Sequence, residues 1–370
     1  MLRLKSYLRE TGALAATTIG AGMFGLPYVF YKSGLVVGVF YLGALSAILI
    51  SVHILYWKIL TKVDAKKRLL GLAREYLGEN WYWVGVISVL AGLTLTLVVY
   101  LILGNEFLKI IWPSASGTLG IFTFWLISVL PLFKEKRILS LEFFGVLFMI
   151  GAILLIFLSA PSLKMAFDTP AFNTNNLFLP FGVVLFSLAG WTIIEPLYAS
   201  RKKTKGGNTY LGPLVLGTVL AAALYAIFVW GILGSTFQLT PDTVSGLLGS
   251  WPIWKLATLS VLGLFAIWTS YIPIGLEIKN SLMEALGWNA REALLFAIFV
   301  PPILLIMGFN NFLSVIGLAG GAFLALQYVL IILVGKRVLK PKDKENLLFN
   351  GVIVAFLLAA VYEAYYFIVG

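Results

Sequence analysis

The amino-acid sequence predicts an all-α polytopic membrane protein, and three observations support this fold class. The chain of 370 residues is 60% hydrophobic and only 12% charged, whereas soluble domains carry roughly 25% charged residues. Apolar segments of about 18 residues or more, which are long enough to cross a bilayer, recur along the whole chain. Two of these segments contain glycine and proline at matching places. We expect one transmembrane domain over residues 1–370, with no soluble domain left over.

Eleven transmembrane helices are expected along the chain. In order, they cover residues 8–31, 35–57, 83–108, 117–133, 142–160, 177–199, 209–235, 252–283, 291–308, 311–335 and 347–369. Most connections between them are short, which favours one bundle over a string of domains. The first segment is too long, and is followed by too many others, to be a cleaved signal peptide.

The net charge of +11 is explained by membrane topology rather than by nucleic acid. Basic residues fall into alternate connections: 3–9, 58–74, 134–137, 201–205, 279–291 and 336–344. The exceptions are Lys32, Lys109, Lys164 and Lys255. Because cytoplasmic loops are enriched in Lys and Arg, the pattern predicts a cytoplasmic N-terminus and an extracellular C-terminus. We expect an integral protein of the plasma (inner) membrane, in contact with the lipid bilayer and with no nucleic acid.

Two connections are longer than the rest. Residues 66–80 place apolar side chains at near-helical spacing with charges between them, which predicts an amphipathic helix at the cytoplasmic surface. Its apolar residues are Leu69, Leu70, Leu72, Ala73, Tyr76 and Leu77. On the other side, residues 238–252 carry Pro241 and Asp242 ahead of a mixed stretch, which predicts a short capped helix or a hairpin.

The first and sixth segments differ from the others because each has small residues in its middle and a proline a few residues later. Residues 19–27 read IGAGMFGLP, and residues 187–196 read SLAGWTIIEP. The two lie five spans apart, so a second set of five spans is inverted relative to the first. We therefore expect inverted repeats at 8–160 and 177–335, with 347–369 as an additional helix. The alternative is that the small residues serve only helix packing.

A helix that unwinds inside the bilayer exposes backbone N–H and C=O groups, so it persists only where a cavity or a ligand satisfies them. The half-helix that starts after Gly22 presents N–H groups and a positive dipole end, which suit a carboxylate. The carbonyl groups that end the preceding half-helix suit a cation or an ammonium group. A zwitterion matches both, so the pattern favours an amino acid, while a neutral polar solute stays open.

The eighth segment carries two adjacent hydroxyls, Thr269 and Ser270, one turn after the backbone carbonyl of Ala266. Oxygen atoms of this kind are suitable ligands for Na⁺. The alternative is that both hydroxyls bond to carbonyls of their own helix, as is common in membrane helices.

Ionisable residues inside the expected spans are costly and often functional, and four of them are singled out as candidates. They are His53, Glu106, Glu195 and Glu277. All four are near helix ends, and basic residues follow Glu195 and Glu277 closely, so ion pairing or snorkelling at the rim is the favoured interpretation. His53 is interpreted as a packing residue rather than a proton relay.

Other classes of function lack the residues that they need. The chain has one histidine and no cysteine, and it contains no HExxH motif, so neither an enzyme nor an enzymatic cofactor is expected. Channel filters usually combine several copies of one carbonyl loop or charged ring, whereas the two breaks here are unequal. An ion channel, or a transporter of a solute other than an amino acid, is kept as the alternative. No obligate protein partner is evident.

Residues 18–27, TIGAGMFGLP, resemble the first-helix signature of the amino acid/auxin permease family, within the amino acid–polyamine–organocation superfamily. The similarity is greatest to its tryptophan/tyrosine permease-like branch, and residues 265–271, FAIWTSY, look like the eighth helix of that branch. The resemblance implies a leucine-transporter-type fold with five-plus-five inverted helices, discontinuous helices one and six, and alternating access around a central site.

The resemblance also implies which residues form the site. Substrate binding is carried over to Thr17, Thr18, Gly20, Ala21, Gly22 and Met23 in the first helix and to Ser187, Leu188, Ala189, Gly190 and Trp191 in the sixth. Tyr100 is added as a candidate by its position in the third span. In sodium-coupled members of this fold, Na⁺ is held by groups that match Ala16, Ile19, Ala266, Thr269 and Ser270.

These observations lead to an expected function, which is symport of a neutral, apolar or aromatic, amino acid coupled to Na⁺ or H⁺. The resemblance leaves the coupling ion open, because the aromatic branch is generally regarded as proton-coupled. Some proton-coupled relatives place a lysine in the fifth span, and residues 142–160 have none. That difference favours Na⁺ or a proton route through a carboxylate.

Overall fold

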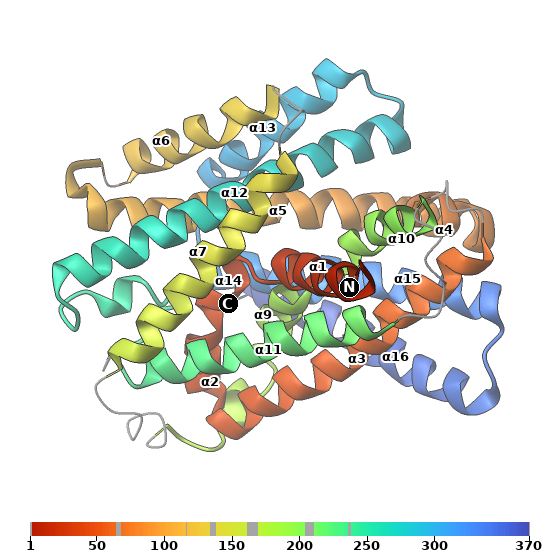
Figure 1. The fold of residues 1–370 in the computed structure, drawn as a ribbon, viewed down its shortest axis with the longest axis horizontal. Coiled ribbons are helices and arrows are strands. Elements are labelled where there is room, and N and C mark those ends of the chain that lie inside the picture. Colours follow the sequence, from red (N-terminus) through yellow and green to blue (C-terminus); the bar gives the residue numbers. More distant parts are fainter. Residues whose placement is uncertain are drawn as a thin grey trace.

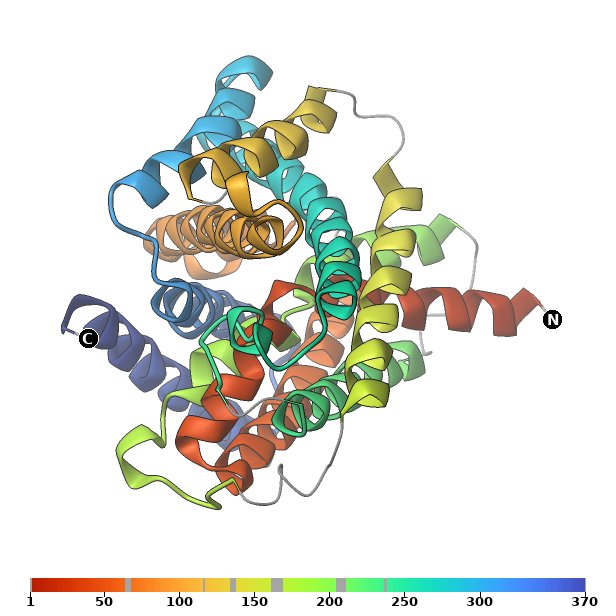
Figure 2. The ribbon, with the colours of Figure 1, turned by 90° about the vertical axis from the view of Figure 1, so that its left-hand side faces the viewer.

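The computed structural model describes residues 2–63, 68–115, 117–133, 138–160, 169–203, 211–235 and 238–369, and it contains no β-strand within these ranges. The helices run mostly along the long axis of the molecule (Figure 1). Seen from one end, they surround the short central segments of the first and sixth expected spans (Figure 2). The all-helical membrane class predicted from the sequence is therefore the observed one.

The helices of nine residues or more follow the expected order. They are α1 (Leu2–Thr18), α3 (Leu35–Lys62), α4 (Leu69–Leu77), α5 (Glu79–Ile111), α6 (Thr118–Val129), α7 (Ile138–Ser159), α9 (Pro180–Leu188), α10 (Ile194–Lys203), α11 (Gly212–Leu233), α12 (Ile253–Leu286), α13 (Ala290–Ile306), α15 (Ala325–Leu339) and α16 (Asp343–Val369). Shorter helical segments between them include η1 (Ala21–Gly25), α2 (Leu26–Ser33), η3 (Leu130–Phe133), η6 (Trp191–Ile193), η7 (Ser245–Leu247), α14 (Phe312–Gly317) and η8 (Leu318–Leu324).

Every expected span contains helix, but not every helix is long enough to cross a bilayer by itself. Of the described residues, seven helical stretches are long and apolar enough to span, or eight when the bent pair Tyr7–Thr18 and Ala21–Ser33 is counted as one. The stretches Thr118–Phe133 and Phe148–Leu158 are apolar but shorter. The structure therefore supports a polytopic membrane protein, while the number of eleven crossings stays a prediction.

The first break lies where the sequence predicts it. α1 ends at Thr18, and Gly20 has an extended backbone (φ −144°, ψ −159°) before the short turn η1. The chain then enters α2 with Pro27 in its first turn, where proline fits because the missing N–H has no helical partner there. The two parts are bent by 50° relative to each other.

The second break has the same character. α9 ends at Leu188, and Ala189 (φ −65°, ψ 123°) and Gly190 (φ −149°, ψ 12°) leave the helical conformation. The turn η6 follows, and α10 begins at Ile194. Both predicted interruptions are therefore confirmed as unwound backbone in the interior of the bundle.

Two buried tyrosines from other helices satisfy the backbone at these breaks. The Tyr225 hydroxyl of α11 lies 2.6 Å from the Thr18 carbonyl oxygen and 2.7 Å from the Ser187 carbonyl oxygen. The Tyr328 hydroxyl of α15 accepts a hydrogen bond from the Gly190 N–H at 3.3 Å. Unpaired backbone groups are costly away from water, so these two phenols stabilise the unwound segments.

A third irregularity was not predicted. η8 is a π-helical segment between α14 and α15, and such segments are frequent at functional sites. It contains Gly320, where an added Cβ would meet the Gly182 carbonyl oxygen of α9. Close backbone approach between the sixth and tenth expected spans therefore requires glycine at this position.

The two long connections agree with their predictions. α4 buries Leu69, Leu70, Leu72 and Ala73, as expected of an amphipathic helix; Lys66 and Lys67, at the start of the predicted helix, lie outside the described residues. Within 238–252, the short turn η7 begins beside Asp242, whose carboxylate accepts a hydrogen bond from the Ser245 N–H at 3.2 Å.

The ends of α3 and α15 and the starts of α5 and α16 lie together at one end of the molecule (Figure 1). These helix ends and α4 carry Lys58, Lys62, Arg68, Lys336 and Arg337, so we call this the basic end. The basic residues in 134–137 and 204–210, and Lys164, lie outside the described residues.

Replacement of Tyr225 by Phe removes a hydroxyl from two buried carbonyl oxygens. We expect Tyr225→Phe to lower the free energy of unfolding by about 1–3 kcal/mol, the usual effect of leaving a buried polar group unsatisfied. Thermal and denaturant unfolding of purified protein in detergent measures this change. Tyr365→Phe is the control, because Tyr365 is 63% exposed; equal stability of the two variants would contradict the assigned role.

Candidate functional site

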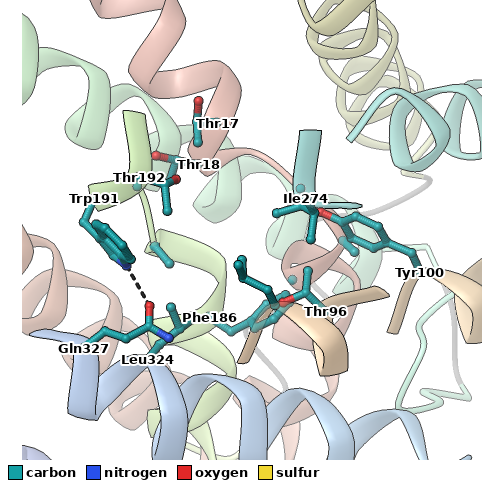
Figure 3. Close-up of a pocket in the computed structure, with 16 residues that line it drawn as sticks. Thr17, Thr18, Thr96, Tyr100, Phe186, Trp191, Thr192, Ile274, Leu324 and Gln327 are labelled. Atoms are coloured by element: carbon teal, nitrogen blue, oxygen red, sulfur yellow. Dashed lines mark hydrogen bonds between the residues drawn. The ribbon is translucent and has the colours of Figure 1, made fainter. Parts of the chain in front are cut away.

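A cavity of about 80 Å³ lies between the two breaks. It is lined by backbone and side chains from α1 and η1, from the α9–η6 junction, and from α5, α12, η8 and α15 (Figure 3). The residues are Thr17, Thr18, Gly20, Ala21, Gly22, Leu93, Thr96, Tyr100, Phe186, Ala189, Gly190, Trp191, Thr192, Ile274, Leu324 and Gln327. The cavity therefore joins both unwound segments to the surrounding helices.

One wall of the cavity is held by a chain of hydrogen bonds. The Trp191 indole N–H donates to the Gln327 side-chain oxygen at 2.8 Å (Figure 3), and the Gln327 amide nitrogen donates to the Ser88 carbonyl at 2.9 Å. These contacts connect η6 to α15 and α5. Because all polar groups of the Gln327 side chain have partners, its orientation is defined, and the indole ring of Trp191 is held in place with it.

The first break presents free donors to this cavity. Ile19 N–H bonds to the Ala15 carbonyl at 2.8 Å, and the next backbone bond runs from Met23 N–H to the Gly20 carbonyl at 3.3 Å. Between them, the N–H groups of Ala21 and Gly22 have no acceptor in the described part of the chain. Helix-start N–H groups of this kind favour an anionic ligand group.

Close packing of the two breaks depends on Gly22. A Cβ added at Gly22 would lie 2.8 Å from the Ser187 Cα and 2.9 Å from a ring carbon of Phe186. Glycine at this position therefore lets η1 and α9 approach backbone to backbone.

A second cavity of about 250 Å³ adjoins the first and shares Thr17, Leu93, Tyr100, Thr192 and Ile274 with it. Its other lining residues are Ala16, Ile19, Ile193, Pro196, Ala266, Ser270, Pro273 and Glu277. It thus continues between α1, α10 and α12 from the breaks toward the basic end.

At that end, the Arg68 side chain joins three acidic residues of two other helices. It pairs with Glu195 of α10 at 3.1 Å and with Glu277 and Glu284 of α12, the latter at 3.6 Å. Glu195 also accepts hydrogen bonds from Tyr56 of α3 and from the Leu69 N–H. Burial lowers the pKa of the Arg68 guanidinium, but the three carboxylates outweigh it and the pKa lies above its ordinary value. This cluster ties α4 to the two helices beside the second cavity.

Most of the predicted binding residues lie at the first cavity. Thr17, Thr18, Gly20, Ala21, Gly22, Ala189, Gly190, Trp191 and Tyr100 line it. Met23, Ser187 and Leu188 do not: their side chains are almost wholly buried, and the Ser187 hydroxyl donates to the Val183 carbonyl at 2.7 Å. These three point into the packing between helices rather than into the cavity.

Several lining residues were not predicted. Leu93, Thr96, Phe186, Thr192, Ile274, Leu324 and Gln327 reach the cavity. The sequence carried a usable signal at Gln327, Thr96 and Thr192, which are uncharged polar residues inside apolar segments. The others are ordinary apolar residues of membrane helices.

The candidate sodium ligands are brought together only in part. Ala16, Ile19, Ala266 and Ser270 line the second cavity, whereas Thr269 is 1% exposed and lines neither. The hydroxyls of Thr269 and Ser270 donate to the Ala266 carbonyl at 2.9 and 3.1 Å. The structure is therefore compatible both with a sodium site, because the oxygens are adjacent, and with a purely structural role, because the hydroxyls bond within their own helix.

The other ionisable residues are paired or packed. Glu106 pairs with Lys109 at 2.6 Å, and Glu195 and Glu277 are paired as predicted, but with Arg68 rather than with the basic residues that follow them. Arg201 instead pairs with Glu10 at 2.5 Å. His53 is fully buried and its Nε2 lies 3.2 Å from the Tyr328 hydroxyl, while its Nδ1 has no partner among the described residues.

Two discontinuous helices that meet at an interior cavity of a helical membrane bundle are typical of membrane transporters. The chain belongs to the tryptophan/tyrosine permease family, whose model matches residues 4–363. It is therefore a transporter rather than an enzyme, as the sequence predicted. No curated protein shows a significant match to the chain.

Solved structures agree with this fold. MhsT in complex with L-phenylalanine is 16% identical, with a TM-score of 0.66 and with 96% of this chain and 97% of that chain covered. The Eremococcus coleocola manganese transporter, in complex with an aromatic bis-isothiourea substituted compound, is 11% identical with a TM-score of 0.60, covering 98% and 94%. Both have the leucine-transporter-type fold, which is thus the fold of this chain.

The approach of the two breaks at Gly22 makes a direct test of the cavity. We expect Gly22→Ala to weaken substrate binding at least about tenfold, because the added methyl group forces η1 away from α9 and small misplacements of a binding group have effects of this size. Isothermal titration or a scintillation-proximity assay measures the affinity. Gly12→Ala is the matched control in α1, since nothing lies within 4 Å of a Cβ there. Similar affinities for both variants would place the ligand elsewhere.

Proposed function

We propose that the protein is a symporter that couples the movement of a neutral, apolar or aromatic, amino acid to Na⁺ or H⁺ by alternating access. The observation that carries the proposal is the pair of free N–H groups, on Ala21 and Gly22, at a cavity formed between two broken helices. A carboxylate is the ligand group that such donors and the dipole of a helix start accept best.

The ammonium group of an amino acid would find hydrogen-bond acceptors at the same cavity. Ala189 lies outside any helix, Gly190 is the N-cap of η6, and both line the first cavity, so the proposal has a backbone carbonyl of this junction accept from the ammonium group. A molecule with a carboxylate and an ammonium on one carbon therefore suits the space between the two breaks. A sugar or another neutral solute would leave the charge pattern of the two half-helices unused.

The remaining walls favour an apolar side chain. Leu93, Phe186, Ile274 and Leu324 present hydrocarbon and aromatic surface, and Tyr100 and Trp191 add two more rings. Pockets of this composition gain binding energy from burial of apolar surface, with a few polar groups that define orientation. The family assignment and the L-phenylalanine bound to MhsT support the same class of substrate.

Na⁺ is proposed at the second cavity, with H⁺ as the alternative coupling ion. Carbonyl groups of Ala16, Ile19 and Ala266 and the hydroxyls of Thr269 and Ser270 are all oxygen ligands. Occupation by Na⁺ requires the two hydroxyls to turn their oxygen lone pairs toward the ion. Each hydroxyl coordinates the ion through its oxygen, either while its hydrogen still bonds to the Ala266 carbonyl or after that hydrogen bond is broken.

The proposed topology has eleven crossings, with repeats at 8–160 and 177–335 and an additional helix at 347–369. The described helices occupy all eleven ranges, and basic residues gather at one end. We propose that this end, with the Arg68 cluster, faces the cytoplasm. The second cavity then leads from the binding site toward the cytoplasm, and the cluster holds α4, α10 and α12 together beside that route.

Uptake by purified protein in liposomes tests the proposed function. We expect saturable, gradient-driven uptake of at least one apolar or aromatic member of a panel of labelled amino acids, because the free donors and apolar walls complement such a molecule. Liposomes without protein are the control. Absence of binding and uptake for the entire panel, or ohmic single-channel currents, would refute the proposal.

Replacement of Na⁺ by choline at fixed pH identifies the coupling ion, and one substitution tests its site. We expect uptake to depend on Na⁺ in the unchanged protein and to lose that dependence in Thr269→Ala, because a ligand oxygen is removed. The control is Thr258→Ala, on the exposed side of the same helix, where the hydroxyl likewise donates to a carbonyl, that of Trp254, at 2.8 Å. Unchanged sodium dependence in Thr269→Ala would remove this residue from the site.

A further inference from the structure

A buried carboxylate outside both cavities has no role in the proposed binding site. Glu363 lies in α16, the helix outside the two repeats, and is only 4% exposed. It is near the end of α16 that lies away from the basic end, six residues before Val369. An ionisable group buried in a membrane protein is expensive and is a functional candidate for that reason. The sequence signal was a single glutamate in the apolar stretch 347–369.

Three glycines, one from the sixth expected span and two from the tenth, surround this carboxylate. A Cβ added at Gly317 of α14 would lie 2.6 Å from the Glu363 Oε2, and one at Gly321 of η8 would lie 2.9 Å from its Cδ. At Gly182 of α9, the nearest atom to an added Cβ is the Glu363 Oε1. We call Gly182, Gly317 and Gly321 the glycine cradle; larger residues at these positions would occupy the space that the carboxylate fills.

Within the cradle, the Glu363 carboxylate takes the place of a helix cap. The Gly182 N–H, in the first turn of α9, donates to Oε1 at 3.1 Å, and the N-cap residue Leu179 offers no side-chain acceptor. An ionised carboxylate at this position interacts favourably with the positive end of the helix dipole. A protonated one keeps the hydrogen bond but loses the charge, so it holds α9 less strongly.

No cation neutralises this carboxylate among the described residues. The titratable groups near it are phenols: Tyr41 of α3 and Tyr362 and Tyr366 of α16 interact with it electrostatically, and Tyr28 of α2 lies near Tyr366. The segments α9, α14 and η8 contribute no titratable residue.

The helix α15, also packed on α16, brings Tyr328, Lys336 and Arg337, but both basic residues are in its last turn. There Lys336 donates to Asn350, near the start of α16. Among the described residues, the charged state of Glu363 is therefore stabilised only by the first turn of α9, through its dipole and the Gly182 N–H, and a proton is the natural means of neutralising it.

We propose that Glu363 is a proton-binding site that controls transport: its ionised form holds α9, α14 and η8 to α16, and its protonated form releases them. The proposal rests on the transport function proposed above, since α9 and η8 carry residues of the binding cavity and alternating access requires such segments to move. The π-helical turn at η8 is a place where a helix readily changes its backbone register. Transport is therefore faster in the protonated state.

The test is the rate of substrate exchange across liposomes at equal pH and equal ion concentrations on both sides, where no gradient drives transport. We expect the exchange rate of the unchanged protein to fall about fivefold between about pH 5 and about pH 8, because the charged contact at the helix start strengthens. Glu363→Gln, which mimics the protonated form, keeps the fast rate over the entire range. Glu345→Gln, on the exposed start of the same helix, keeps the pH dependence.

The outcome separates this proposal from the transport function itself. Exchange in Glu363→Gln with the pH profile of the unchanged protein would overturn the proton site but leave amino acid transport in place. Slow exchange in Glu363→Gln at every pH, with an unfolding temperature close to that of the unchanged protein, would also overturn the proton site. Transport would then require the carboxylate itself, and glutamine would not replace its protonated form. A lowered unfolding temperature together with lost exchange assigns Glu363 to stability alone and contradicts the proposal as well. Absence of exchange in the unchanged protein would instead count against the transport function.

Discussion

Backbone groups that leave a helix inside a membrane must find partners within the protein, and the architecture of this transporter depends on how that demand is met. Tyr225 of α11 serves carbonyl oxygens of both broken helices, and Tyr328 of α15 accepts from the second break. The groups that the tyrosines do not reach are the N–H groups of Ala21 and Gly22, two residues that line the cavity. The proposed binding site thus arises where most of the unwound backbone has partners and a few donors do not.

Carboxylates in two different surroundings lie at the two halves of the sixth expected span. At the basic end, Arg68 neutralises Glu195 and Glu277 beside the second cavity. At the start of α9, Glu363 accepts from the Gly182 N–H without a basic partner among the described residues. Arginine keeps its charge across physiological pH. The sixth expected span thus has one carboxylate contact with a basic partner and one without, and the proposed proton control acts on the second.

Sequence patterns identified the helices and the breaks because hydrophobic length and glycine or proline act locally. They did not identify which face of each helix turns inward. Met23, Ser187 and Leu188 belong to the predicted motifs, yet they pack between helices, while Gln327 and Leu324 reach the cavity from a span that carried no motif. Rotation of a helix about its axis is set by its neighbours, so residues in one short motif divide between helix packing and the cavity lining.

By itself, the sequence determined that this chain is a polytopic helical membrane protein, that two of its helices are interrupted, and, through the motif at 18–27, the family to which it belongs. These properties follow from composition and from local backbone preferences. Only the tertiary structure decided the partners: Arg68 for Glu195, Tyr225 for two carbonyls, and three glycines for Glu363. Each such contact joins residues more than a hundred positions apart or on separate helices, and no local pattern encodes which distant side chain fills a given space.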